Sequence, residues 1–184
     1  MTIIKALKIQ TWIMSSITIR DARPEDMDNI AMLHANSWII AYRGLLSDQY
    51  LDNDLQGGRK KYWAQTLPTI KGKEFVLVAE RDQEIIGFVA VLDKPEAGCD
   101  ALVDNLHVRP DLKGQGIGGL LLKAVAKRLI ETGRKSYYLT VLVGNTSAEK
   151  FYLAKGGVPR DISTREFGGK EVQITKFVWE RLTD

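Results

Sequence analysis

The chain has 184 residues, of which 45% are hydrophobic, and its formal net charge is +3. This length suits one globular domain with a sizeable core. The small charge and the scattered basic residues argue against nucleic acid as a partner, because nucleic-acid-binding surfaces concentrate Lys and Arg. The single cysteine, Cys99, excludes an internal disulfide, and we expect a reducing, cytoplasmic location for the protein.

The N-terminal segment is apolar but short. Residues 1–13 carry Lys5 and Lys8 and lack both the roughly 20 apolar residues of a membrane-spanning helix and the pattern of a secretion signal. We therefore expect no membrane partner. Residues 1–16 are interpreted as an N-terminal extension, with Met14 as a candidate native start, and residues 17–184 as one domain.

The first half of this domain mixes strands and helices. Residues 17–21 are predicted to form a short strand. Pro24, followed by two acidic residues, begins a helix, because proline and acidic side chains favour the first helical turn. Residues 48–66 are predicted to form one or two further helices, broken around Gly57 and Gly58.

The middle of the chain is more regular. Two apolar runs, residues 75–79 and 85–92, flank a short turn and predict a β-hairpin. Residues 101–108 form the next predicted strand. A helix follows and ends before Gly133; it packs on the sheet through apolar residues at four-residue spacing, namely Ile117, Leu121, Val125 and Leu129.

The C-terminal part continues the alternation. Residues 137–143 predict a strand and residues 145–156 a helix. Gly168 and Gly169 centre a closing hairpin whose second arm is residues 172–179. Because strands and helices are mixed throughout, we predict an α/β fold with a central mixed sheet flanked by helices.

The most informative segment spans residues 106–119. An apolar strand runs into a proline, a lysine, a glycine cluster and then an apolar helix. Glycines let the backbone approach a ligand without obstruction by a Cβ atom, and the first turn of a helix directs free N–H groups at an anion. The segment therefore predicts a site for the diphosphate of a cofactor.

The glycine cluster has more than one interpretation. Residues 114–119 satisfy G-x-G-x-x-G, a dinucleotide fingerprint that needs its glycines directly after a strand and an acidic residue about 20 positions later. Here a proline-containing loop intervenes, and the next strand ends in Val143, Gly144 and Asn145 without a carboxylate. This disfavours a nicotinamide or flavin role. An ordinary tight turn before a helix remains an alternative.

In another frame the cluster matches a different signature. Lys113-x-x-Gly116-x-Gly118 resembles the (Arg/Gln)-x-x-Gly-x-(Gly/Ala) motif of the GNAT superfamily of acetyl-CoA-dependent N-acetyltransferases, with Lys113 as a cationic replacement. Residues 145–157 resemble the second motif of that family, Asn-x-x-Ala-x-x-Phe-Tyr-x-x-x-Gly-Phe, except that Val158 follows the glycines. The two motifs stand in the family's order and spacing, and the resemblance covers about residues 17–182.

This resemblance implies the GNAT acyltransferase fold, with a mixed, mostly antiparallel sheet, and acetyl-CoA as the co-substrate. In the family, peptide groups of the strand before the glycines pair with the pantetheine arm, and amides of the glycine loop bind the diphosphate. The cofactor-binding residues so implied are Leu106, His107, Val108, Lys113, Gly114, Gln115, Gly116, Ile117, Gly118, Gly119 and Asn145.

Asn145 has an alternative role as the cap of the following helix. Thr146 and Glu149 form a capping box, however, and we expect that box to supply the cap. The side chain of Asn145 would then be free to bond the pantetheine arm, as the resemblance implies.

Tyr152 is the candidate general acid. A Phe-Tyr pair on a helix is usually part of a core, but this pair stands in the second motif. The phenol pKa of about 10 is close to the thiol pKa of about 8.5, so the phenol can give a proton to the departing thiolate.

The acceptor amine must lose its own charge before it attacks. An alkylamine has a pKa of about 10.4, so the neutral form costs about 4.6 kcal/mol at pH 7. Either a base or a site that lowers the pKa of the amine must relieve this cost. Asp104 is two residues before Leu106, and strand alternation would put both on one face. Asp104 is thus a candidate base or, equally, a solvated strand residue; His107 and His34 are weaker candidates.

The acceptor pocket is less well defined. Trp38 and Tyr42 form either an i, i+4 core pair or a wall of that pocket, with Arg43 meeting a carboxylate on the acceptor. The expected partner is a small-molecule or peptide amine, and a homodimer is compatible with the resemblance.

The resulting prediction is direct acetyl transfer to a primary amine, without a covalent acyl-enzyme. The sequence carries no metal-ligation motif, so we expect no metal, and Cys99 has no evident base beside it. The alternative is a non-catalytic acyl-CoA-binding regulator on the same fold.

Overall fold

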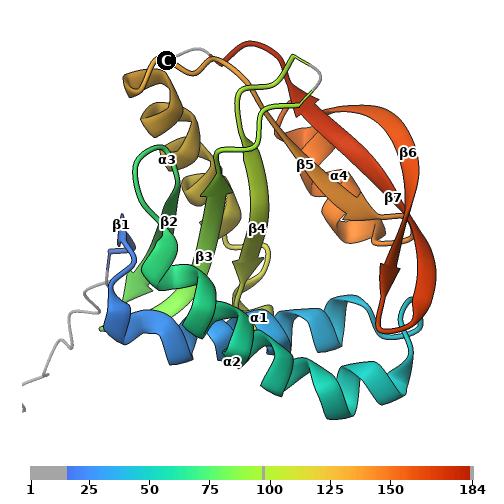
Figure 1. Cartoon of the computed structure of the whole chain (residues 1–184). Coiled ribbons are helices and arrows are strands. Elements are labelled where there is room, and N and C mark those ends of the chain that lie inside the picture. The colour runs from blue at the N-terminus through green and yellow to red at the C-terminus, as the bar shows by residue number, and fades with distance from the viewer. Residues whose placement is uncertain (1–15, 97, 183–184) are drawn as a thin grey trace, which may run out of the picture.

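One mixed sheet organises the molecule. The computed structural model describes residues 16–96 and 98–182, so Met14 and nearly all of the predicted extension lie outside the described residues. Within these residues seven strands follow the order β1-β2-β3-β4-β5-β7-β6 (Figure 1). They are β1 (Thr18–Asp21), β2 (Phe75–Arg81), β3 (Glu84–Leu92), β4 (Leu102–Val108), β5 (Tyr137–Leu142), β6 (Val158–Phe167) and β7 (Lys170–Trp179).

Helices cover both faces of this sheet. They are α1 (Met27–Ala41), α2 (Leu55–Thr66), α3 (Ile117–Glu131) and α4 (Thr146–Ala154). Helices α1 and α2 share one apolar cluster with β2 and β3, whereas α3 and α4 pack with alternate residues of the same strands on the opposite face. Strands β2 and β3 are therefore buried on both faces, which explains their continuous apolar sequences.

The predicted α/β fold is confirmed. The four apolar residues at four-residue spacing in α3 are all buried. Gly133 follows the end of α3 with a φ of +76°, which is the left-handed conformation expected after a helix. The sheet is mostly antiparallel, and β4 and β5 are its parallel neighbours.

The predicted break around Gly57 and Gly58 is wrong. Both glycines lie inside the continuous helix α2, which a π-helical segment, Tyr50–Asp54, precedes. Glycine costs about 1 kcal/mol in a helix interior. Leu55 and Trp63 of α2 are almost fully buried, and burying large apolar side chains contributes more than the glycines lose.

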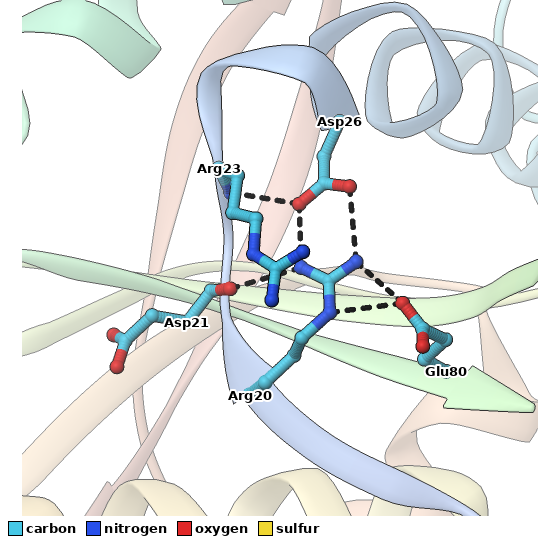
Figure 2. A network of polar contacts seen from close by, with 5 residues as sticks. All are labelled: Arg20, Asp21, Arg23, Asp26 and Glu80. Carbon is cyan, nitrogen blue, oxygen red and sulfur yellow. Dashed lines mark hydrogen bonds and ion pairs between the residues drawn. The ribbon is translucent and has the colours of Figure 1, made fainter. Parts of the chain in front are cut away.

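A polar network attaches the start of α1 to the sheet (Figure 2). Arg20 of β1 donates to Asp26 just before α1, with an Nη1–Oδ2 distance of 2.6 Å, and to Glu80 of β2, with an Nε–Oε2 distance of 2.9 Å. Asp26 is 6% exposed and also accepts the backbone N–H of Arg23 at 2.7 Å. The carboxylate of Asp26 thus fixes where α1 begins relative to β1.

We expect Asp26→Asn to lower the free energy of unfolding by about 2–4 kcal/mol at pH 7, because it removes one partner from a largely buried ion pair. Burial raises the pKa of Asp26, but hydrogen bonds from Arg20 and the Arg23 amide hold it below its ordinary value. The stabilisation is therefore present above about pH 4 and is lost as the pH falls further.

Chemical denaturation of the wild type and of Asp26→Asn, at pH 7 and at pH 3, measures the difference in their free energies of unfolding. It should shrink at pH 3, whereas an equal difference at both pH values would contradict a role for the charge. Asp28→Asn is the matched control, because Asp28 forms an exposed ion pair with Lys60; it should change stability by less than about 0.5 kcal/mol.

Candidate functional site

The sheet opens between β4 and β5. The two strands pair at one position, Leu102 with Tyr138, and then diverge (Figure 1). The pairing of β4 with β3, in contrast, continues to Val108. Among the described strands, none pairs with the later peptide groups of β4 on the β5 side. A cavity of about 500 Å³ occupies this opening.

The glycine loop closes one end of the cavity. Gly114 and Gly116 have φ values of +82° and +84°, a conformation that glycine adopts without strain. The first hydrogen bond of α3 joins the Leu120 amide to the Gly116 carbonyl, at 3.1 Å. The amides of the three preceding residues therefore have no acceptor within the helix, and these residues line the cavity: Ile117, Gly118 and Gly119.

Two lysines flank these amides. Lys113 and Lys155 both line the cavity, and a Cβ atom on Gly119 would lie 3.3 Å from the Nζ atom of Lys155. Burial lowers the pKa of Lys113. A Cβ atom on Gly118 would lie 3.0 Å from the ring of Phe151, so the lack of a side chain there lets α3 and α4 approach. This end of the cavity therefore combines free amides with two cations, which suits a polyanion.

Asn145 is at the start of α4. Its Oδ1 atom accepts the Ala148 N–H at 3.2 Å and caps the helix, so the expectation that Thr146 supplies the cap is wrong. The helix begins at Thr146 itself, and the capping position is therefore one residue earlier than the Thr146-x-x-Glu149 pattern suggests. Asn145 nevertheless lines the cavity, next to Tyr42.

Tyr152 lines the same cavity from α4. Its side chain is 8% exposed, and its ring packs against Phe151, Phe177 and Trp179. Burial raises the pKa of Tyr152, and the neighbouring Tyr42 adds to this effect. The phenol therefore holds its proton throughout the neutral range.

Asp104 does not line the cavity. Ala90 pairs with Asn105 but Val91 pairs with Val103, so Asp104 is the extra residue of a β-bulge. Its carboxylate accepts hydrogen bonds from the Tyr62 hydroxyl at 3.2 Å and from the Asn105 amide at 2.6 Å. The expectation that Asp104 and Leu106 share a face is wrong, because a bulge breaks strand alternation.

His107 lines the cavity instead. Its Nδ1 atom lies 3.1 Å from the Ser37 hydroxyl, and its ring stacks on His34 with a centroid distance of 4.6 Å. The indole N–H of Trp63 donates to Nδ1 of His34 at 3.0 Å. Burial lowers the pKa of His107 to about 3 and strongly lowers that of His34. Both imidazoles are therefore neutral at pH 7.

The three residues predicted for the acceptor pocket lie in different environments. Trp38 and Tyr42 contact each other edge to face at 4.9 Å; Trp38 is a core residue, whereas Tyr42 lines the cavity. Arg43 forms exposed ion pairs with Asp48 and Asp52 and lies outside the cavity lining. Arg43 thus forms ion pairs with nearby residues and does not contribute to the cavity wall.

Most predicted cofactor residues come together. Apart from Gln115, all of them line the cavity. Sequence reasoning missed Lys155, although it follows Tyr152 by three residues and so shares its helix face. It also missed Ser37 and Ala41 of α1, whose placement depends on how α1 packs against β4. No Asp or Glu contributes to the cavity wall within the described residues.

The described residues contain no group of three or more His, Cys, Asp or Glu side chains arranged to hold a metal ion. In the same part of the chain, no helix is long and apolar enough to cross a membrane.

Solved structures share this architecture. The PaiA N-acetyltransferase of Thermoplasma acidophilum, solved in complex with coenzyme A, superposes with a TM-score of 0.66 at 22% identity, covering 87% of this chain and 98% of that one. YncA of Salmonella typhimurium, described as a putative acetyltransferase with its cofactor acetyl-CoA, gives a TM-score of 0.65 at 18% identity, covering 91% and 95%. These similarities confirm the predicted GNAT fold.

Curated relatives agree. An uncharacterized N-acetyltransferase of Archaeoglobus fulgidus is 30% identical over 159 residues, which cover 82% of this chain and 96% of the relative. An uncharacterized N-acetyltransferase of Bacillus subtilis, YuaI, is 26% identical over 71% of this chain and 75% of its own length. The sequence model of the GNAT acetyltransferase family matches residues 39–156. The chain therefore belongs to the GNAT acetyltransferase family.

Proposed function

We propose that this chain transfers the acetyl group of acetyl-CoA directly to the amine of a small molecule or peptide. One observation carries the proposal: a single cavity combines the unpaired edge of β4, a glycine loop with two lysines, and the Tyr152 side chain. The coenzyme A and acetyl-CoA complexes of the two related structures support the same choice of co-substrate.

The chemistry of the cavity wall fits this co-substrate. The free amides at the start of α3, with Lys113 and Lys155, supply donors and positive charge for a diphosphate. The peptide groups of Leu106 and Val108 supply donors and acceptors for the amide groups of a pantetheine arm. Bound acetyl-CoA would provide the thioester, and the residues of this chain would orient it.

The cavity also influences the protonation of the acceptor. The described wall carries no carboxylate that could stabilise an ammonium ion, and His107, with a pKa of about 3, is too weak a base to deprotonate one. An apolar cavity with nearby cations instead lowers the pKa of an entering amine. Of the two routes that the sequence leaves open, these features favour a site that lowers the amine pKa over a side-chain base.

Tyr152 assists the leaving group. As the amine nitrogen bonds to the acetyl carbon and the carbon–sulfur bond breaks, the Tyr152 hydroxyl gives its proton to the sulfur. The nitrogen is positively charged once it has bonded to the carbon, and the Tyr152 phenolate takes a proton from it. The net reaction therefore moves one proton from nitrogen to sulfur. The raised pKa of Tyr152 keeps the proton in place until the thiolate forms.

Tyr152→Phe tests this role, because phenylalanine keeps the ring packing and removes the hydroxyl. We expect kcat to fall by about 100-fold or more while the Kd for coenzyme A changes by less than about twofold. Thiol release at saturating acetyl-CoA, with the best amine from a panel, measures kcat. Near-full turnover would remove Tyr152 from the mechanism. Asp104→Asn is the control outside the cavity and should keep turnover within about twofold of wild type.

Lys155→Gln tests the anion-binding end of the cavity. We expect the Kd for coenzyme A to rise by about 5–20-fold at low ionic strength and by less at high salt, because salt screens charge interactions. Calorimetry measures the Kd at low and at high ionic strength. Lys150→Gln, an exposed lysine of the same helix outside the cavity, should leave Kd unchanged. Equal effects of the two substitutions would show that general surface charge, not this site, controls binding.

The alternative function, a non-catalytic acyl-CoA-binding regulator, makes a different prediction. Such a protein would bind acetyl-CoA but release no thiol with any amine of a broad panel. An N-acetyltransferase releases thiol above the rate of hydrolysis with at least one of them.

A further inference from the structure

An arginine interrupts the buried face of α2. Leu55 and Trp63 lie on this face and are 1% and 0% exposed, and Arg59 lies midway between them at four-residue spacing, so its side chain points the same way. Its side chain is half-buried. A charged group in a row of core residues loses hydration, which is costly unless an opposite charge compensates it.

The contacts of Arg59 do not provide that opposite charge. Its guanidinium lies 4.0 Å from the ring centroid of Trp38, and one nitrogen donates to the Tyr50 hydroxyl at 3.4 Å. Over residues 16–96 and 98–182, no carboxylate forms an ion pair with Arg59. Arg43, on the neighbouring loop, pairs with two aspartates.

Arg59 lies outside the cavity lining but one residue layer from it. Trp38, on which it stacks, contacts Tyr42 of the cavity wall. The charge of Arg59 helps to lower the pKa of His107, another wall residue. The uncompensated cation therefore acts on the α1 side of the cavity, away from the glycine loop and the two lysines at the start of α3.

The turn between β6 and β7 encloses this region. The Phe167 ring lies 5.5 Å from Trp38, and a Cβ atom on Gly168 would clash with the ring of Tyr50. The Lys170 ammonium donates to the Leu45 carbonyl at 2.8 Å. The hairpin thus packs against Trp38 and Tyr50, the two residues that contact the guanidinium. The half-buried Arg59 side chain is partly shielded from water, which strengthens its interaction with an anion.

We propose that Arg59 binds a carboxylate of the acceptor, so that the preferred acceptors are amines that also carry a carboxylate. The inference rests on the acetyl transfer proposed above and names the class of its acceptor. An arginine fork matches a carboxylate with two parallel hydrogen bonds. Polycationic amines are disfavoured, because Arg59 and the lysines repel them and the described cavity wall offers no carboxylate.

Two matched probes test this assignment: 4-(aminomethyl)benzoate and 4-(aminomethyl)benzamide. The ring separates the amine from the variable group, so the two amines have similar basicity. We expect wild-type kcat/KM to favour the carboxylate by about tenfold or more. In Arg59→Gln the preference should fall to within about threefold, through loss of activity on the carboxylate alone. Arg59→Lys, which keeps the charge without the fork, should retain part of the preference.

Arg43→Gln is the matched control. It removes a nearby arginine that is already paired with Asp48 and Asp52, so the preference should stay at the wild-type value. Equal activity of the wild type on both probes would overturn the proposal. An equal loss on both probes in Arg59→Gln, with the preference intact, would also overturn it and would indicate a structural role for the stack on Trp38.

A binding measurement separates this proposal from acetyl transfer itself. With coenzyme A bound, calorimetry with 4-methylbenzoate, which has no amine, should show binding to the wild type and at least a tenfold weaker Kd in Arg59→Gln. If neither amine is acetylated but this difference appears, the anion site stands and the proposed transfer fails. If amines are acetylated but 4-methylbenzoate binds both proteins equally, the transfer stands and the role of Arg59 fails.

Discussion

The separation of β4 from β5 is the constraint on which the rest of the site depends. Backbone N–H and C=O groups inside a protein need hydrogen-bond partners, and a continuous sheet would satisfy those of β4 on both sides. Here β4 keeps its ladder with β3 while its other edge faces a cavity. A ligand with alternating donors and acceptors can complete that edge, so the break in the sheet creates the candidate site.

The charges around the cavity follow one scheme. The described wall has cations and the neutral imidazole of His107 but no carboxylate. One set of positive groups, at the start of α3, favours a polyanion. The same positive environment opposes an ammonium ion, and so it favours a neutral amine. In the proposed reaction, binding of the co-substrate and activation of the acceptor would thus depend on the same positive charges.

The sequence predicted the residues at the α3 end of the cavity because local rules govern their conformation. The glycines in the loop before α3 have backbone angles or contacts that favour glycine, and the apolar spacing of α3 predicts its buried face. The features that the sequence did not predict depend on tertiary structure. A bulge at Asp104 reverses the strand alternation, the packing of Leu55 and Trp63 overrides two helix-breaking glycines, and the cap of α4 falls on Asn145. At Asp104 and Asn145, a shift of one residue separates the predicted position from the observed one.

The contact between Gly168 and Tyr50 has a consequence for how this protein can diversify. It joins the β6–β7 turn to the segment before α2, next to Trp38 and the cavity residue Tyr42, whereas the glycine loop precedes α3, on the other face of the sheet. The α1 side and the α3 side of the cavity are thus built from different parts of the chain. Under the proposed function, mutations on the α1 side can change which amine is acetylated, while the α3 side continues to bind the same acyl donor.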